Sequence, residues 1–63
     1  MAYQKDYKFV FEDGATATLQ AKSKFLARLT LSMFASDRVG QTAIGFVEGE
    51  EDKTFKAKVE KLE

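Results

Sequence analysis

The sequence predicts an α+β fold, a four-stranded antiparallel sheet with one helix packed on a face, in the chain order ββαββ. Four segments alternate apolar and polar residues with the period of a strand, and the segment between the second and third repeats apolar residues at helical spacing. The chain contains no proline that would break these segments. No linker or repeat divides it, so residues 1–63 are expected to form a single domain.

Residues 3–21 are predicted to form the first β-hairpin. Residues 3–12, YQKDYKFVFE, end in an alternation of aromatic and β-branched residues at period two, which is typical of a strand. Asp13 and Gly14 follow at once, and this pair favours a two-residue type I′ turn, in which both positions need a positive φ. Residues 15–21, ATATLQA, alternate again and complete the hairpin.

Residues 23–40, SKFLARLTLSMFASDRVG, admit two interpretations. As a helix they carry an apolar stripe about 100° wide, the width expected of a helix that covers a core. This stripe consists of Phe25, Leu26, Leu29 and Met33. As a strand they alternate apolar and polar residues over 27–33, but three large apolar side chains then remain unplaced.

We prefer the helix and expect it over residues 24–36. Ser23 is suited to the N-cap because its hydroxyl can accept a hydrogen bond from the first turn, and Gly40 is suited to the exit. Thr30 and Ser32 are poor helix formers and favour the strand interpretation.

Residues 41–48, QTAIGFVE, and residues 54–62, TFKAKVEKL, are predicted to form the second hairpin. Ile44 and Phe46 share one side of the first strand, and a polar, glycine-bearing loop joins the two strands. The predicted core takes one apolar face from each element. Its members are Tyr7, Phe9, Phe11, Ala17, Leu19, Phe25, Leu26, Leu29, Met33, Ile44, Phe46, Phe55, Ala57 and Val59.

A second apolar stripe lies on the opposite side of the predicted helix, where a surface helix normally carries charge. It contains Ala27, Leu31 and Phe34 and is rimmed by Lys24, Arg28 and Arg38. We expect these residues to bind a protein partner, most simply a second copy of the chain in a symmetric homodimer. Two alternatives stay open: the helix could be wedged in a curved sheet, or single exposed apolar residues could be harmless.

The composition excludes several classes of function. The chain of 63 residues has no cysteine and no histidine, which removes disulfides, zinc sites built from these residues, imidazole bases and thiolate nucleophiles. Oligomerisation is the reinforcement that remains for so small a core. We therefore expect no enzymatic activity, no cofactor, no metal and no small-molecule substrate.

Charge and hydropathy indicate a cytoplasmic location without membrane attachment. Ten basic and ten acidic residues cancel, so long-range steering toward nucleic acid or a membrane is weak. No apolar run approaches the length of a membrane span, and MAYQKDYK has no signal-peptide core.

The last predicted strand suggests an alternative function, binding of single-stranded nucleic acid. Lysines in and around it could follow phosphates while a tyrosine stacks on a base. These residues are Lys53, Lys56, Lys58, Lys61 and Tyr3. The competing explanation is an edge strand whose lysines prevent aggregation between sheets.

The loop of the second hairpin carries a cluster of carboxylates, Glu48, Glu50, Glu51 and Asp52. Carboxylates can bind Ca²⁺ or Mg²⁺, but EGEEDK lacks the ligand spacing of an EF-hand loop. We expect a solvated turn.

Overall fold

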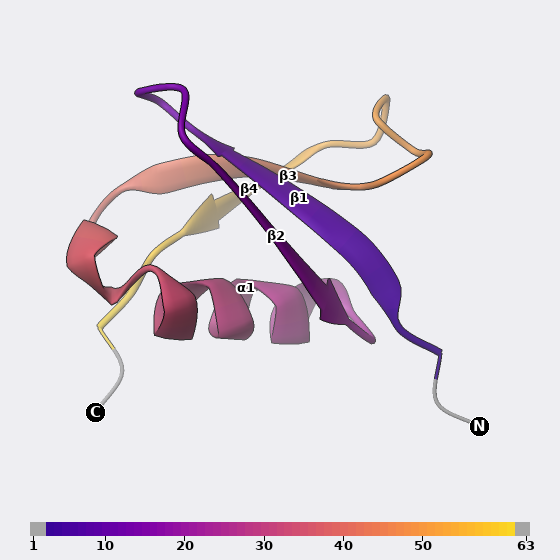
Figure 1. The fold of residues 1–63 in the computed structure, drawn as a ribbon, viewed down its shortest axis with the longest axis horizontal. Coiled ribbons are helices and arrows are strands. Elements are labelled where there is room, and N and C mark those ends of the chain that lie inside the picture. Colours follow the sequence, from indigo (N-terminus) through magenta and orange to yellow (C-terminus); the bar gives the residue numbers. More distant parts are fainter. Residues whose placement is uncertain (1–2, 62–63) are drawn as a thin grey trace.

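The protein has two layers, a four-stranded antiparallel sheet and one helix that covers a single face of it (Figure 1). The structure is a computed structural model and describes residues 3–61. It confirms the predicted α+β fold and the order ββαββ. The elements are β1 (Lys5–Phe11), β2 (Thr16–Ala21), α1 (Lys24–Phe34), a short 3₁₀ helix η1 (Ser36–Arg38), β3 (Thr42–Val47) and β4 (Phe55–Lys58).

The strands lie in the order β2-β1-β3-β4, and all neighbouring pairs are antiparallel. β1 and β3 are therefore the central strands, and β2 and β4 form the two edges. Because β2 and β3 are not neighbours, α1 carries the chain from one edge back to the centre of the sheet (Figure 1).

The turn between β1 and β2 differs from the predicted type I′ turn. Gly14 has a φ of 91°, but no other residue type in the described chain, Asp13 included, has a positive φ. The Gly14 N–H donates to the Phe11 carbonyl at 3.0 Å, and the Phe11 N–H donates to the Ala15 carbonyl at 2.8 Å. The connection is thus a three-residue loop, a type I turn followed by a left-handed glycine. The Asp13 side chain stabilises it by accepting the Ala15 N–H at 3.1 Å.

The predicted inner face of β3 is also wrong. Phe9 pairs directly with Gly45, and opposed residues of an antiparallel pair point to the same face. A Cβ at Gly45 would lie 2.5 Å from Cε1 of Phe9, so the ring already occupies the space above this position. The helix-facing side of β3 therefore carries Ala43 and Gly45, and the larger Ile44 and Phe46 point to the open face of the sheet.

Aromatic rings from β1 and β4 fill the centre of the core. The ring centroids of Phe9 and Phe55 are 5.9 Å apart, and those of Tyr7 and Phe55 are 6.1 Å apart, both in edge-to-face contact. The predicted core residues confirmed as buried are Tyr7, Phe9, Phe11, Leu19, Ala57 and Val59. Ala17, Phe46 and Phe55 are half-buried.

The helix itself is confirmed. The Oγ of Ser23 accepts the Leu26 N–H at 3.3 Å, which is the predicted N-cap interaction. Ala35 is the C-cap, so α1 ends at Phe34, two residues before the expected limit of residue 36. η1 then turns the chain toward β3.

The predicted orientation of α1 is reversed. Its buried residues are Ala27, Leu31 and Ser32. The residues predicted for the core, Phe25, Leu26, Leu29 and Met33, lie on the opposite side and are exposed. The physical reason is space: the aromatic side chains of the sheet fill the layer beneath the helix, so small residues and a single leucine fit between the two.

Candidate interaction surface

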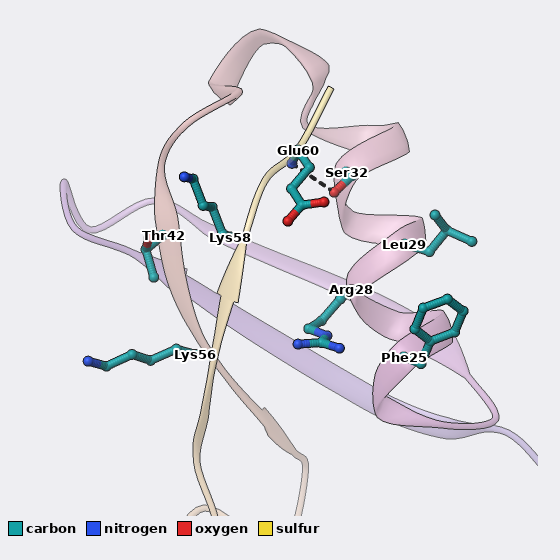
Figure 2. Close-up of a pocket in the computed structure, with 8 residues that line it drawn as sticks. All are labelled: Phe25, Arg28, Leu29, Ser32, Thr42, Lys56, Lys58 and Glu60. Carbon is teal, nitrogen blue, oxygen red and sulfur yellow. Dashed lines mark hydrogen bonds between the residues drawn. The ribbon is translucent and has the colours of Figure 1, made fainter. Parts of the chain in front are cut away.

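Four large apolar side chains form the exposed side of α1, which we call the outer helix face. Phe25 and Met33 are 64% and 60% exposed, and Leu26 and Leu29 are 40% and 38% exposed. Spacings of three and four residues place them along one stripe. Figure 2 shows Phe25 and Leu29 pointing away from the sheet. A continuous apolar surface of this kind marks an interaction site more often than scattered exposed residues do.

The sequence contains a signal for this arrangement that apolar periodicity alone does not capture. Both sides of the helix are apolar, but one side carries the smaller residues, Ala27 and Ser32 among them. Three aromatic residues of β1 and one of β4 share the inner sheet face, so the helix side with small residues is the one that fits there. Matching side-chain volume between helix and sheet would have identified the outer helix face.

The residues predicted to bind a partner do not lie together on one surface of the protein. Ala27 and Leu31 have no exposed surface and pack on the sheet, so they cannot contact a partner, which corrects that prediction. Phe34 is 70% exposed, but at about 100° per residue it lies to one side of the outer helix face. Lys24 places its Nζ 5.3 Å from the ring centroid of Phe55, on the sheet side of α1.

Arg38 has a structural role instead of a place on the rim. Its Nη1 donates to Oδ2 of Asp13 at 3.0 Å and to Oε1 of Gln41 at 3.1 Å, and its guanidinium lies 4.8 Å from the centroid of the Phe11 ring. The hydrogen bond from the Ala15 N–H, followed by the contact with Arg38, lowers the pKa of Asp13 below its ordinary value of 3.8. Arg38 thus ties η1 to the β1–β2 turn.

A groove of about 370 Å³ lies between α1 and β4. The helix lines it with Phe25, Arg28, Leu29 and Ser32, and the strand side lines it with Thr42, Lys56, Lys58 and Glu60 (Figure 2). Figure 2 shows Arg28 extending into the gap between α1 and β4, whereas both lysines extend from the far side of β4. The Glu60 N–H donates to Oγ of Ser32 at 3.1 Å and closes one end.

The residues predicted for nucleic-acid binding occupy several regions. Lys56 and Lys58 share the open face of the sheet at the β4 edge. Lys53 lies in the β3–β4 loop with its Nζ 3.9 Å from Oε1 of Glu50. Tyr3 precedes β1 and is 80% exposed, and Lys61 follows β4 and lines a separate depression that Met33 also borders.

The carboxylates of the acidic loop do not converge on one point in the part of the chain that the structure describes. Over residues 3–61, no group of three or more potential ligands lies close enough to hold a metal ion. Its carboxylate-bearing residues are exposed, in agreement with a solvated turn.

Comparison with known proteins gives no relative from which a function could be transferred. The chain matches no family model, no curated protein and no solved structure. Between residues 3 and 61, no helix is long and apolar enough to cross a membrane.

Proposed function

We propose that this chain is a small intracellular, non-catalytic interaction module that self-associates through the outer helix face. The observation that carries the proposal is the exposure of Phe25, Leu26, Leu29 and Met33 on one side of α1. Full burial of each such side chain contributes about 1.5–3 kcal/mol before ordering costs are subtracted. A 63-residue chain has a thin core, so association is an effective way for it to bury more apolar surface.

The charges at the two ends of α1 favour a second copy packed antiparallel. The first turn of α1 has no acidic residue and the last turn has no basic residue. Instead Lys22 and Lys24 lie at the amino end, and Asp37 lies just beyond the carboxyl end. This distribution is opposite to the one that the helix dipole favours. An antiparallel partner helix would bring its carboxyl end and Asp37 beside the amino end of this helix and Lys22, so that each copy offsets the charge of the other.

Sedimentation equilibrium at several concentrations tests this proposal directly. We expect the wild type to be a dimer at high micromolar concentration and Leu29→Lys to be a monomer, because a lysine at the centre of the stripe would have to lose its hydration on association. Phe34→Lys is the matched control, an exposed apolar residue of the same helix outside the stripe, and should remain dimeric. A monomeric wild type, or a dimeric Leu29→Lys, would refute self-association through this face.

Binding of single-stranded nucleic acid is the second candidate function. Lys56 and the half-buried Phe46 line one depression on the open face of the sheet, and Lys58 lies on the same face. Against it, Lys53 is near Glu50, and ten acidic residues balance the ten basic ones. Titration with a labelled oligonucleotide at two salt concentrations tests it: micromolar binding that weakens steeply with salt supports it, and no binding at low salt removes it.

A further inference from the structure

β4 is an edge strand with one unpaired side. Its inner side pairs with β3, and over the described residues no strand lies on its outer side. The hydrogen bonds at the carboxyl end of β4 show which of its backbone N–H and C=O groups point away from β3. The Val59 N–H donates to the Gln41 carbonyl at 2.9 Å, toward β3, whereas the next N–H, of Glu60, turns outward to Ser32. Backbone groups alternate along a strand, so the N–H and C=O groups of Lys56 and Lys58 also face outward.

This edge is basic. Lys56 and Lys58 border it on the open face of the sheet, and Arg28 approaches it from the helix side (Figure 2). Glu60 is the one carboxylate among the residues that line the groove. A ligand bound along β4 would therefore meet three cations and one anion. It would also meet the outward N–H and C=O groups of Lys56 and Lys58.

The charge of this edge selects among possible occupants. A second copy that paired its own β4 antiparallel with this one would place lysines opposite lysines on the same face, which is destabilising. An extended segment with acidic residues at alternate positions would place carboxylates opposite Lys56 and Lys58. Its intervening side chains would lie on the helix side, below Arg28. The complementary occupant is thus an acidic strand from another protein.

From these observations the geometry points to a second binding site: the free edge of β4 adds an extended acidic segment of a partner protein as a fifth strand of the sheet. The main chain of the segment would bond to the outward groups of Lys56 and Lys58. Because Ser32 already binds the Glu60 N–H, the added strand ends at Lys58 and is short. Phe25 and Leu29 of the outer helix face also line the groove, but the main-chain groups that would bind the added strand belong to β4 and not to α1.

A fluorescent peptide of alternating glutamate and valine tests the site by fluorescence anisotropy. We expect the peptide to bind and a lysine-valine peptide not to bind. Lys58→Ala removes one charge and should weaken binding about two- to fivefold. Lys58→Pro also removes the outward N–H without removing a bond to β3, and should weaken binding a further three- to tenfold or so. Equal affinities of the proline and alanine variants would overturn strand addition.

Two controls separate strand addition from folding defects and from general attraction to anions. Thr18→Pro removes the corresponding outward N–H at the β2 edge and should bind like the wild type. If Lys58→Pro does not fold, the wild-type amides decide: peptide must shift the NMR signals and slow the hydrogen exchange of Lys56 and Lys58, and unchanged amides overturn the site. Tighter binding of an oligothymidine probe than of the peptide would also overturn it, in favour of nucleic acid. Leu26→Lys changes the outer helix face at a residue that does not line the groove, so it should weaken the dimer and retain peptide binding, and this site and the dimer can fail separately.

Discussion

The Oγ of Ser32 accepts the backbone N–H of Glu60 at 3.1 Å and thereby joins the last turn of α1 to the segment that follows β4. Ser32 is the buried polar residue among those described, with 6% of its surface exposed. The bond satisfies an outward N–H that the β4 edge would otherwise leave unpaired beneath the helix. It also fixes the distance between α1 and β4 and so sets the width of the groove between them.

Ser32→Ala should therefore destabilise the fold. The substitution leaves the Glu60 N–H without its partner, and we expect a loss of about 1–3 kcal/mol in the free energy of unfolding, measured by urea denaturation. Ser36→Ala, at an exposed position of η1, is the control and should change stability by less than about 0.5 kcal/mol. Similar effects of the two substitutions would show that the Ser32 bond contributes nothing specific.

Gly45→Ala should also be destabilising, although alanine is usually the more stable residue in a strand. The added Cβ would lie 2.5 Å from Cε1 of Phe9 and 2.9 Å from Cζ of Phe55, and Phe9 is fully buried. We expect a cost of about 1–3 kcal/mol in thermal or urea unfolding. Phe9→Leu removes the clashing ring atom, so the double variant should lose less stability than the sum of the single variants. Strict additivity would contradict the proposed clash.

The stability of the protein should depend on Asp13 in acid. The Ala15 N–H and Arg38 lower the pKa of Asp13 in the folded state. Its carboxylate therefore stabilises the fold fully at pH values above 3.8, the ordinary pKa of the group. This contribution is lost as the pH falls through the lowered pKa. In urea titrations, Asp13→Asn should be less stable than the wild type at pH values well above 3.8, and the difference should shrink in stronger acid. A pH-independent difference for Asp13→Asn would contradict the assignment.

Local signals in the sequence were sufficient for the elements and their order. The alternation in residues 3–12 and 15–21 predicts the first hairpin, and Ser23 marks the start of α1 where the structure has it. These features depend on the period and chemistry of neighbouring residues, which a single sequence displays directly. The prediction of a type I′ turn was wrong because Asp-Gly also suits a type I turn followed by a left-handed glycine, in which only Gly14 needs a positive φ.

Which face of an element is buried could not be predicted from period alone. In α1 and in β3 the larger apolar residues, such as Leu29 and Ile44, lie outside, and smaller ones, such as Ala27 and Gly45, lie inside. The space between the helix and the sheet is limited, and the aromatic rings of β1 and β4 fill most of it. This information is distributed over strands distant in sequence. The exposed apolar side of α1 was therefore predicted on the wrong side of the helix.

The antiparallel dimer makes a specific prediction about charge pairing. Around a two-fold axis near Leu29 in the proposed dimer, Lys22 of one copy would lie beside Asp37 of the other, and the symmetry would repeat this pair. Lys22→Asp alone and Asp37→Lys alone each place like charges together at both ends. We expect either variant to dissociate about two- to tenfold more readily than the wild type in sedimentation experiments.

Mixing the two variants should restore association, because a heterodimer of Lys22→Asp with Asp37→Lys has opposite charges at both ends. Fluorescence energy transfer between the two labelled variants measures this directly: the mixed dimer should exceed the statistical proportion. The excess should diminish in 0.5 M salt or thereabouts, because exposed charges are screened within a few ångströms at that ionic strength. A statistical mixture at low salt would exclude the pairing of residues 22 and 37. A parallel pair of helices would instead be recognised from the single variants: it places Lys22 beside Lys22 and Asp37 beside Asp37, so either single variant would only exchange one like-charged pair for another and associate like the wild type.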